Sequence, residues 1–172
     1  MKKSNLKVLV GDSSNSEESP IIASSKREAI KILECGGNVS NLNSFNDSYS
    51  VMYSAVTKDG SKLGLCSDRL KKNQKLVYAA ILSYSNAIFL ANPMYMKDKT
   101  AIIYAFISSE GELSLKQFDP EFSKDYDIAF FAVKSNKDEL DNVDLTLRNN
   151  NVFMNTINEE LERTEKKYRK VV

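Results

Sequence analysis

A short apolar pattern recurs along this chain of 172 residues at an almost constant interval. Four copies carry an alanine at the same place, with 25, 25 and 27 residues between successive copies: Ala55, Ala80, Ala105 and Ala132. Degenerate copies flank them, with Ile32 and Leu33 before and Thr156 and Ile157 after. A period of this length predicts small structural units stacked on one another, because a single unit cannot bury its own apolar face.

Each copy begins with the pattern of an amphipathic helix. A residue type that favours helix N-caps stands seven residues before each anchor: Ser25, Ser48, Asn73, Asp98, Asp125 and Asn149. Apolar residues four and three before the anchor and one after it form a single stripe on a helix, as Leu76, Val77 and Ile81 do around Ala80. Glycines or asparagines beyond the stripe predict where the helices end: Gly36, Gly37, Gly60, Asn86, Gly111 and Asn136.

The second half of each unit carries a shorter apolar pattern, such as Leu63, Leu65 and Leu70. It leaves room for a short helix or a helical turn, and the strict alternation of a strand is not sustained. The sequence therefore predicts an all-α array of short two-helix repeats, either solenoid-like or a compact bundle. The expected repeats are residues 24–45, 46–70, 71–95, 96–122 and 123–147.

The two ends of the chain differ from the middle. Residues 148–172 hold one helical stripe from Phe153 to Val171, which predicts a C-terminal capping helix. Residues 1–23 form an N-terminal segment in which 11–19 are polar and read as a loop or a flexible stretch. Residues 6–10 have the pattern of a lone strand.

Residues 58–81 resemble a linked pair of units from the bacterial domain of unknown function 4116. That family repeats the pattern N-G-x-x-L-x-x-A-S-x-x-L-x-x-D-x-x-V-V-x-x-A-V. Cys66 and Ser67 stand where the family has Ala-Ser, and Asn73 stands where it has Asp. The resemblance covers about residues 46–157, and later copies depart from it at Asn92-Pro93 and at 118–120. It implies short helical-hairpin repeats and carries no activity with it.

Composition excludes several classes of chemistry. Histidine is absent, which excludes Ser-His and Cys-His catalysis and every metal site that needs an imidazole. The two cysteines cannot form a four-thiolate zinc site or a disulfide framework. No cofactor and no metal are therefore expected. The longest apolar run has seven residues, 101–107, and the run at 8–10 is too short for a signal peptide, so a soluble cytoplasmic protein is expected.

The cysteines themselves fit structural roles. Cys66 occupies the alanine place of its repeat, where a small buried side chain is expected. Cys35 precedes Gly36 at the end of a predicted helix, where the helix dipole disfavours a thiolate. Neither position favours a catalytic thiol.

Charge is unevenly spread although the net charge is only +1. Residues 58–75 hold six basic residues against two acidic ones, and residues 110–144 hold ten acidic residues against four basic ones. The candidate partner-binding residues come from the first of these clusters: Lys62, Arg69, Lys71, Lys72 and Lys75. The asymmetry is either incidental to a solvated surface or it steers a partner with the opposite layout.

The expected function is that of a non-catalytic helical-repeat protein, a protein-protein interaction or scaffold module; this rests on analogy from the fold. The alternative is a nucleic-acid-binding accessory protein that uses the 58–75 cluster together with the C-terminal basic residues Arg148, Lys166, Lys167, Arg169 and Lys170. The near-zero net charge weighs against this alternative. A third class is an enzyme with a site made only of carboxylates. Abundant Asn and Ser, and 19 Lys against 5 Arg, favour an AT-rich bacterial or phage genome.

Overall fold

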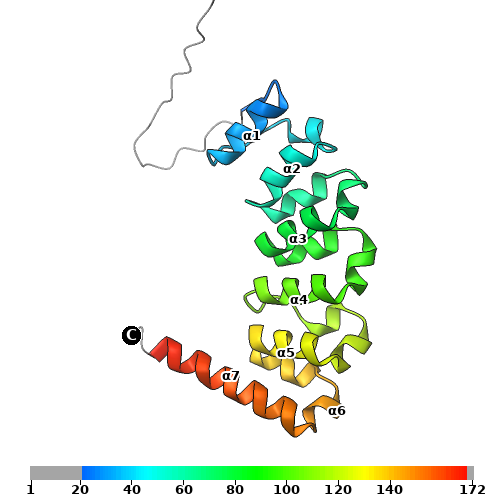
Figure 1. The fold of residues 1–172 in the computed structure, drawn as a ribbon, viewed down its shortest axis with the longest axis vertical. Coiled ribbons are helices and arrows are strands. Elements are labelled where there is room, and N and C mark those ends of the chain that lie inside the picture. Colours follow the sequence, from blue (N-terminus) through cyan, green and yellow to red (C-terminus); the bar gives the residue numbers. More distant parts are fainter. Residues whose placement is uncertain (1–20, 170–172) are drawn as a thin grey trace, which may run out of the picture.

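The structure is a computed structural model that describes residues 21–169, and it confirms the predicted all-α class. Within these residues no β-strand forms, and a single bridge joins Ile21 to Val39. The α-helices are α1 (Lys26–Glu34), α2 (Tyr49–Val56), α3 (Gln74–Ser83), α4 (Lys99–Ser108), α5 (Tyr126–Ser135), α6 (Leu145–Arg148) and α7 (Asn151–Arg169). Helices α1 to α5 stack in chain order, and α7 packs against α5 at the far end (Figure 1).

The helices begin where polar caps are available. The side chains of Ser25, Asn73, Asp98 and Asp125 accept hydrogen bonds from backbone N–H groups of the first turns of α1, α3, α4 and α5. Such a bond satisfies one of the donors that a helix start leaves without a partner. Ser48 is the cap residue of α2, without a side-chain bond.

The predicted start of the last helix was wrong by one residue. Asn150, and not Asn149, accepts from the N–H groups of Val152 and Phe153, at 2.9 and 3.2 Å. Asn149 instead follows the last residue of α6, a short helix that the sequence pattern did not separate from α7. The buried anchor of α7 is therefore Ile157, which is 1% exposed, while Thr156 is only half-buried.

The helices end before the predicted stop residues, but only two of the stops use the left-handed conformation expected of them. Gly36 (φ +87°) and Gly111 (φ +91°) adopt the left-handed conformation just after α1 and α4. Gly60 and Asn86 lie inside later 3-10 helices, and Asn136 is extended (φ −148°) after α5 and caps the 3-10 helix that follows. At these three places the chain enters the next helical turn directly, so no left-handed residue is needed.

A pair of 3-10 helices follows each of α2, α3 and α4, whereas one follows α1, and α5 is followed by one 3-10 helix and then α6. The 3-10 helices are η1 (Leu42–Phe45), η2 (Gly60–Leu65), η3 (Leu70–Lys72), η4 (Ser85–Leu90), η5 (Pro93–Lys97), η6 (Leu115–Gln117), η7 (Pro120–Lys124) and η8 (Lys137–Asn142). Pro93 and Pro120 occupy the first positions of η5 and η7, where a missing N–H has no cost. Asn92 and Asp119 cap these two turns from the preceding position.

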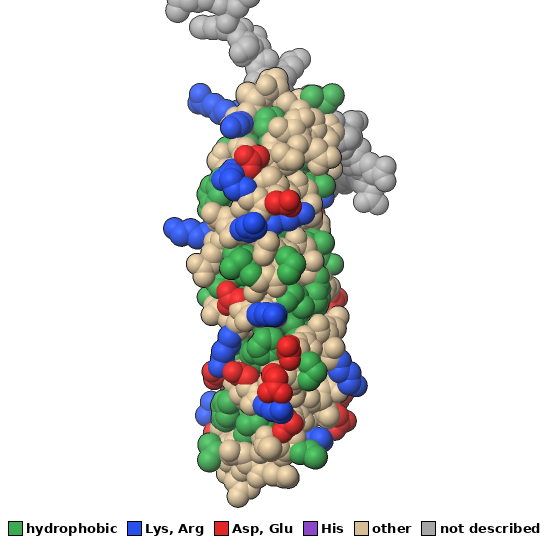
Figure 2. Space-filling model, turned by 90° about the vertical axis from the view of Figure 1, so that its right-hand side faces the viewer, with side chains coloured by type: hydrophobic (Ala, Val, Ile, Leu, Met, Phe, Trp, Pro, Cys, Tyr) green, Lys and Arg blue, Asp and Glu red, His purple; other side chains and the backbone are tan. Residues whose placement is uncertain are grey.

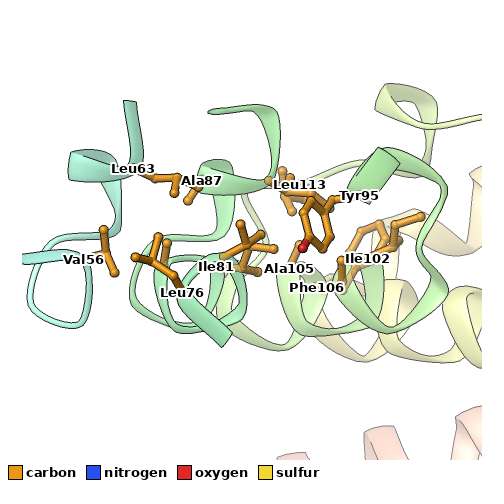
Figure 3. Packing of buried hydrophobic residues seen from close by; sticks show 14 of the residues in the cluster. Val56, Leu63, Leu76, Ile81, Ala87, Tyr95, Ile102, Ala105, Phe106 and Leu113 are labelled. Atoms are coloured by element: carbon orange, nitrogen blue, oxygen red, sulfur yellow. The ribbon is translucent and has the colours of Figure 1, made fainter. Parts of the chain in front are cut away.

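The core lies between the α-helices and the segments that follow them (Figure 3). Leu63, Ala87 and Leu113 come from those segments and face side chains of the helices. All four anchor alanines are at most 2% exposed, which lets neighbouring helices approach closely. Most of the second apolar pattern is buried as well, but Leu65 is 38% exposed.

The terminal segments are described only in part. The N-terminal segment predicted at 1–23 and its strand at 6–10 lie almost wholly outside the described residues. Ile21 exchanges backbone hydrogen bonds with Asn38 and Ser40, and Ala23 is buried. In α7, Phe153 and Ile157 are buried, Leu161 is half-buried and Thr164 is exposed.

Candidate interaction surface

Helices α2 to α5 and α7 all begin on the same side of the stack. The starts are joined by the ion pair of Lys99 with Asp125, and the ends of α3 and α4 by the bond from the Ser108 hydroxyl to the Ile81 carbonyl (2.8 Å). We call this side the helix-start edge; it consists of η3, η5, η7, α6 and the first turns of α3, α4, α5 and α7. It lies on the right in Figure 1, where α6 is labelled, and Figure 2 shows it face on.

Hydrogen bonds between the segments that precede successive helices hold the helix-start edge together. Backbone N–H groups of Ser67, Asn92 and Asp144 donate to the carbonyls of Asn46, Lys71 and Ser123, at 2.9 to 3.1 Å. The hydroxyl of Tyr95 also donates to the carbonyl of Lys72 (2.9 Å). Because these bonds fix the turns to one another, the side chains on the edge are presented at a defined spacing.

Two of the five basic candidates are engaged inside the chain. Lys62 pairs with Asp59 at 3.1 Å, and Nε of Arg69 donates to Asp47 at 2.9 Å. Hydrogen bonds from Ser67 and then from Arg69 lower the pKa of Asp47 below its usual value. Exposed ion pairs of this kind add little stability.

The other three candidates lie together in sequence and on the helix-start edge. Lys71 and Lys72 belong to η3, and Lys75 lies in the first turn of α3. Lys72 and Lys75 are exposed and Lys71 is half-buried. Across residues 21–169 no carboxylate lies within ion-pair distance of these three ammonium groups. The predicted cluster is thus reduced to three available lysines.

Within the described residues, the C-terminal basic residues that the nucleic-acid alternative requires do not lie beside the basic residues of 58–75. Arg148 ends α6, and its Nε is buried without a hydrogen-bond partner in the described part of the chain. Lys166 pairs with Glu162 at 3.2 Å within α7. The side chains of Lys167 and Arg169, and all of Lys170, fall outside the description.

The sequence patterns missed the apolar side chains on the same edge. Met94 in η5 is 58% exposed, and Leu145 and Val152 are 62% and 68% exposed. In Figure 2 the upper part of this face is mostly basic, hydrophobic side chains lie in the middle, and most of the acidic side chains lie below them, interspersed with basic ones. One feature of the sequence could have indicated that Met94 is exposed. It follows Asn92-Pro93, where the repeated apolar pattern is interrupted.

The acidic part of the helix-start edge lies at η7 and at the start of α5. The side chains of Glu121 and Asp127 are 74% and 57% exposed. The hydrogen bonds that the Lys99 ammonium donates to Asp127 and Asp125 raise the pKa of Lys99. Burial alone would raise the pKa of Asp125, but its bonds to Lys99 and to the N–H of Ile128 outweigh burial and lower it. Asp125 therefore stays charged at neutral pH.

Among the side chains that the structure describes, no group of three His, Cys, Asp or Glu is placed to hold a metal ion. Glu139 is a buried carboxylate that the sequence patterns missed, and it accepts from the N–H of Leu115 (2.8 Å) and from Asn142 (3.1 Å). These bonds give it a structural role in joining η8 to η6. No helix among residues 21–169 is long and apolar enough to cross a membrane.

The two cysteines should react very differently with an alkylating reagent. Burial raises the pKa of the Cys66 thiol to about 11, so only about one part in a thousand is thiolate at pH 8. Cys35 is exposed. With iodoacetamide at pH 8, mass spectrometry should find Cys35 modified and Cys66 protected in the folded protein, and both modified in urea. Equal rates in the folded protein would contradict the packing described for Cys66.

No protein-family model, no curated protein and no solved structure matches this chain. The resemblance to the domain of unknown function 4116 therefore stays a prediction, and functional inference rests on the surface just described.

Proposed function

We propose that the chain is a non-catalytic helical-repeat protein that binds another protein through its helix-start edge. The observation that carries this proposal is the exposure of Met94, Leu145 and Val152 on one edge, beside lysines and carboxylates that remain open to solvent. Exposed apolar side chains rimmed by charge are typical of protein interaction sites.

The repeat interpretation is part of this proposal. The unit is one α-helix followed by two short helical turns, and the cap residues Ser48, Asn73, Asp98 and Asp125 recur at intervals of 25, 25 and 27 residues. Helix α7 is the capping helix. Its buried side chains Phe153 and Ile157 face the core. On its exposed surface Glu159 pairs with Arg163 and Glu162 pairs with Lys166.

A nucleic-acid partner is the weaker candidate. Lys71, Lys72 and Lys75 would suit phosphate groups, but Glu121 and Asp127 lie on the same edge and would repel a polyanion that followed it. Lys62 and Arg69 already pair with Asp59 and Asp47, so phosphate groups would have to compete with these carboxylates for them.

A capture experiment with matched variants tests the protein-binding proposal. Tagged chain is used on a lysate of the source cells, and captured proteins are quantified by mass spectrometry. Met94→Asp should lose the specific partner, because a carboxylate replaces an exposed apolar contact on the helix-start edge. Ile107→Asp is the control, since Ile107 is similarly exposed (52%) but lies in the last turn of α4, away from that edge. Equal capture by both variants would refute the proposed surface.

Fluorescence anisotropy with labelled oligonucleotides tests the alternative. Binding near physiological salt should be no tighter than the nonspecific range of about 10⁻⁴ to 10⁻⁶ M. A nanomolar affinity that falls steeply with salt, and that is abolished when Lys71, Lys72 and Lys75 are replaced by serine, would replace the protein-binding proposal with the nucleic-acid one.

A further inference from the structure

Equivalent positions on the helix-start edge change charge in a regular order along the stack. Four residues before the caps of α3, α4 and α5 stand Arg69, Met94 and Glu121. Two residues after the same caps stand Lys75, Thr100 and Asp127. Both series run from basic through uncharged to acidic.

The uncharged member of each series is the middle one. The available lysines Lys71, Lys72 and Lys75 lie one unit before η5, and the exposed carboxylates Glu121 and Asp127 lie one unit after it. The middle part also carries Lys97 and Lys99, and the acidic part carries Lys124. The formal charge of the edge therefore falls from +3 (three Lys) in residues 70–77 to +1 (two Lys, one Asp) in 93–102 and −2 (one Lys, three acids) in 120–129, with Met94 in the middle part. Figure 2 shows the same order, with hydrophobic side chains between the basic and the acidic parts.

We infer that the helix-start edge binds a second copy of this chain, antiparallel, around a two-fold axis that passes close to Met94. This inference rests on the proposed function and names the partner of the same surface. In this arrangement the lysines of one copy face Glu121 and Asp127 of the other, and the same contact occurs a second time by symmetry. The two Met94 side chains cover each other at the centre, where a flexible thioether adapts its shape readily.

The charge order favours a second copy because a two-fold interface must be complementary to itself. A surface whose charge changes sign about its centre meets this condition only when the copies run in opposite directions. A parallel arrangement would place lysines against lysines and carboxylates against carboxylates, which costs several kcal/mol for close like charges. The orientation of the pair is thus set by the positions of Lys75 and Asp127.

The existing ion pairs of the acidic residues do not block this contact. Glu121 pairs with Lys124 and Asp127 with Lys99, yet both carboxylates remain more than half exposed. An exposed ion pair adds little stability, so exchanging or sharing its cation costs little. The basic partners Lys72 and Lys75 are exposed and make no competing ion pair within residues 21–169.

Paired charge reversals test the inference. The first variant carries Lys72→Glu and Lys75→Glu, and the second carries Glu121→Lys and Asp127→Lys. All four side chains are exposed, and circular dichroism melts check that each variant stays folded. Analytical ultracentrifugation of the full-length chain at low ionic strength should show a dimer for the wild type. Each variant alone should be a monomer, because each places like charges together twice.

The mixture of the two variants gives the decisive result. In a mixed pair the new glutamates face the new lysines, and the original carboxylates of the first variant face the original lysines of the second. The mixture should therefore form a heterodimer although neither component dimerises alone. Raising the salt to about 1 M, which shortens the screening length to about 3 Å, should weaken the wild-type and the mixed dimers alike.

Three outcomes would overturn the inference. In the first, the wild-type chain stays monomeric up to about 0.1 mM at low salt. In the second, both charge-reversed variants still dimerise when measured separately. In the third, the mixture of the two variants stays monomeric. The proposed function has a separate readout. A monomeric wild type that still captures a different protein, and loses it in Met94→Asp, refutes the second copy as partner and leaves the protein-binding proposal standing.

Discussion

Replacing Gly60 by alanine should lower the free energy of unfolding by about 3 kcal/mol, the upper part of the range for overpacked sites. A Cβ atom at this position would lie 2.1 Å from the carbonyl oxygen of Ala80 and 2.8 Å from Cβ of Tyr84. Both neighbours are held by α3 and its end, so neither can turn aside as a flexible side chain would. The start of η2 would have to move away from α3. Urea melts followed by circular dichroism measure the loss.

Gly64→Ala is the matched control, because Gly64 lies in the same 3-10 helix. The nearest atom to its added Cβ is Cδ1 of Leu90 at 3.9 Å, an ordinary contact distance. The substitution should be neutral or should stabilise the protein by about 0.4 to 1 kcal/mol, since alanine restricts the unfolded chain. A similar loss at both glycines would show that η2 does not pack against α3 as described.

Phe106→Ala should cost about 3 to 5 kcal/mol of unfolding free energy, as large-to-small changes of buried aromatic residues do. The ring of Phe106 is fully buried, and its centroid lies 5.6 Å from that of Phe118. Its loss would leave a cavity between α4 and the segment that follows it. Ile107→Ala, at the neighbouring half-exposed position, should cost less than about 1 kcal/mol. Equal losses in urea melts would mean that the buried face of α4 is assigned wrongly.

The starts of the α-helices could be predicted from the sequence because their cause is local. A cap residue and the apolar stripe behind it lie within one or two turns, so Asn73 with Leu76 and Val77 is sufficient to predict α3. The error at Asn149 has a local cause as well. Two adjacent asparagines can each cap, and only the presence of α6 decides that Asn149 ends one helix while Asn150 begins the next.

The turns between the helices could not be predicted in the same way. Gly60 has the composition of a helix stop, but its role is to allow η2 to approach the backbone of α3, a contact with residues 20 or more positions away. Whether a short apolar pattern forms one α-helical turn or two 3-10 turns depends on such contacts. The same reason explains Leu65, which shares the pattern of Leu63 and yet is exposed.

The candidate surface could also be predicted from the sequence only in part. Residues 58–75 could be recognised as basic, but the partner of Arg69 is Asp47, which lies just before α2 and is 22 positions away. The sequence therefore overestimated the number of available cations. It also missed Met94, because an apolar residue in a repeat is expected in the core and only the fold shows that this one faces water.

The parallel course of α2 to α5 has an electrostatic consequence across the width of the molecule. Each helix carries an effective charge of about +0.5 at its start, and in a parallel stack these charges add along one edge instead of cancelling. Asp98 and Asp125 neutralise two of the starts, whereas α3 begins at the uncharged Asn73 with Lys75 in its first turn. The positive potential is therefore concentrated at the start of α3. The molecule is polarised both across the stack and along it, so its field turns an approaching charged partner about two axes before the surfaces touch.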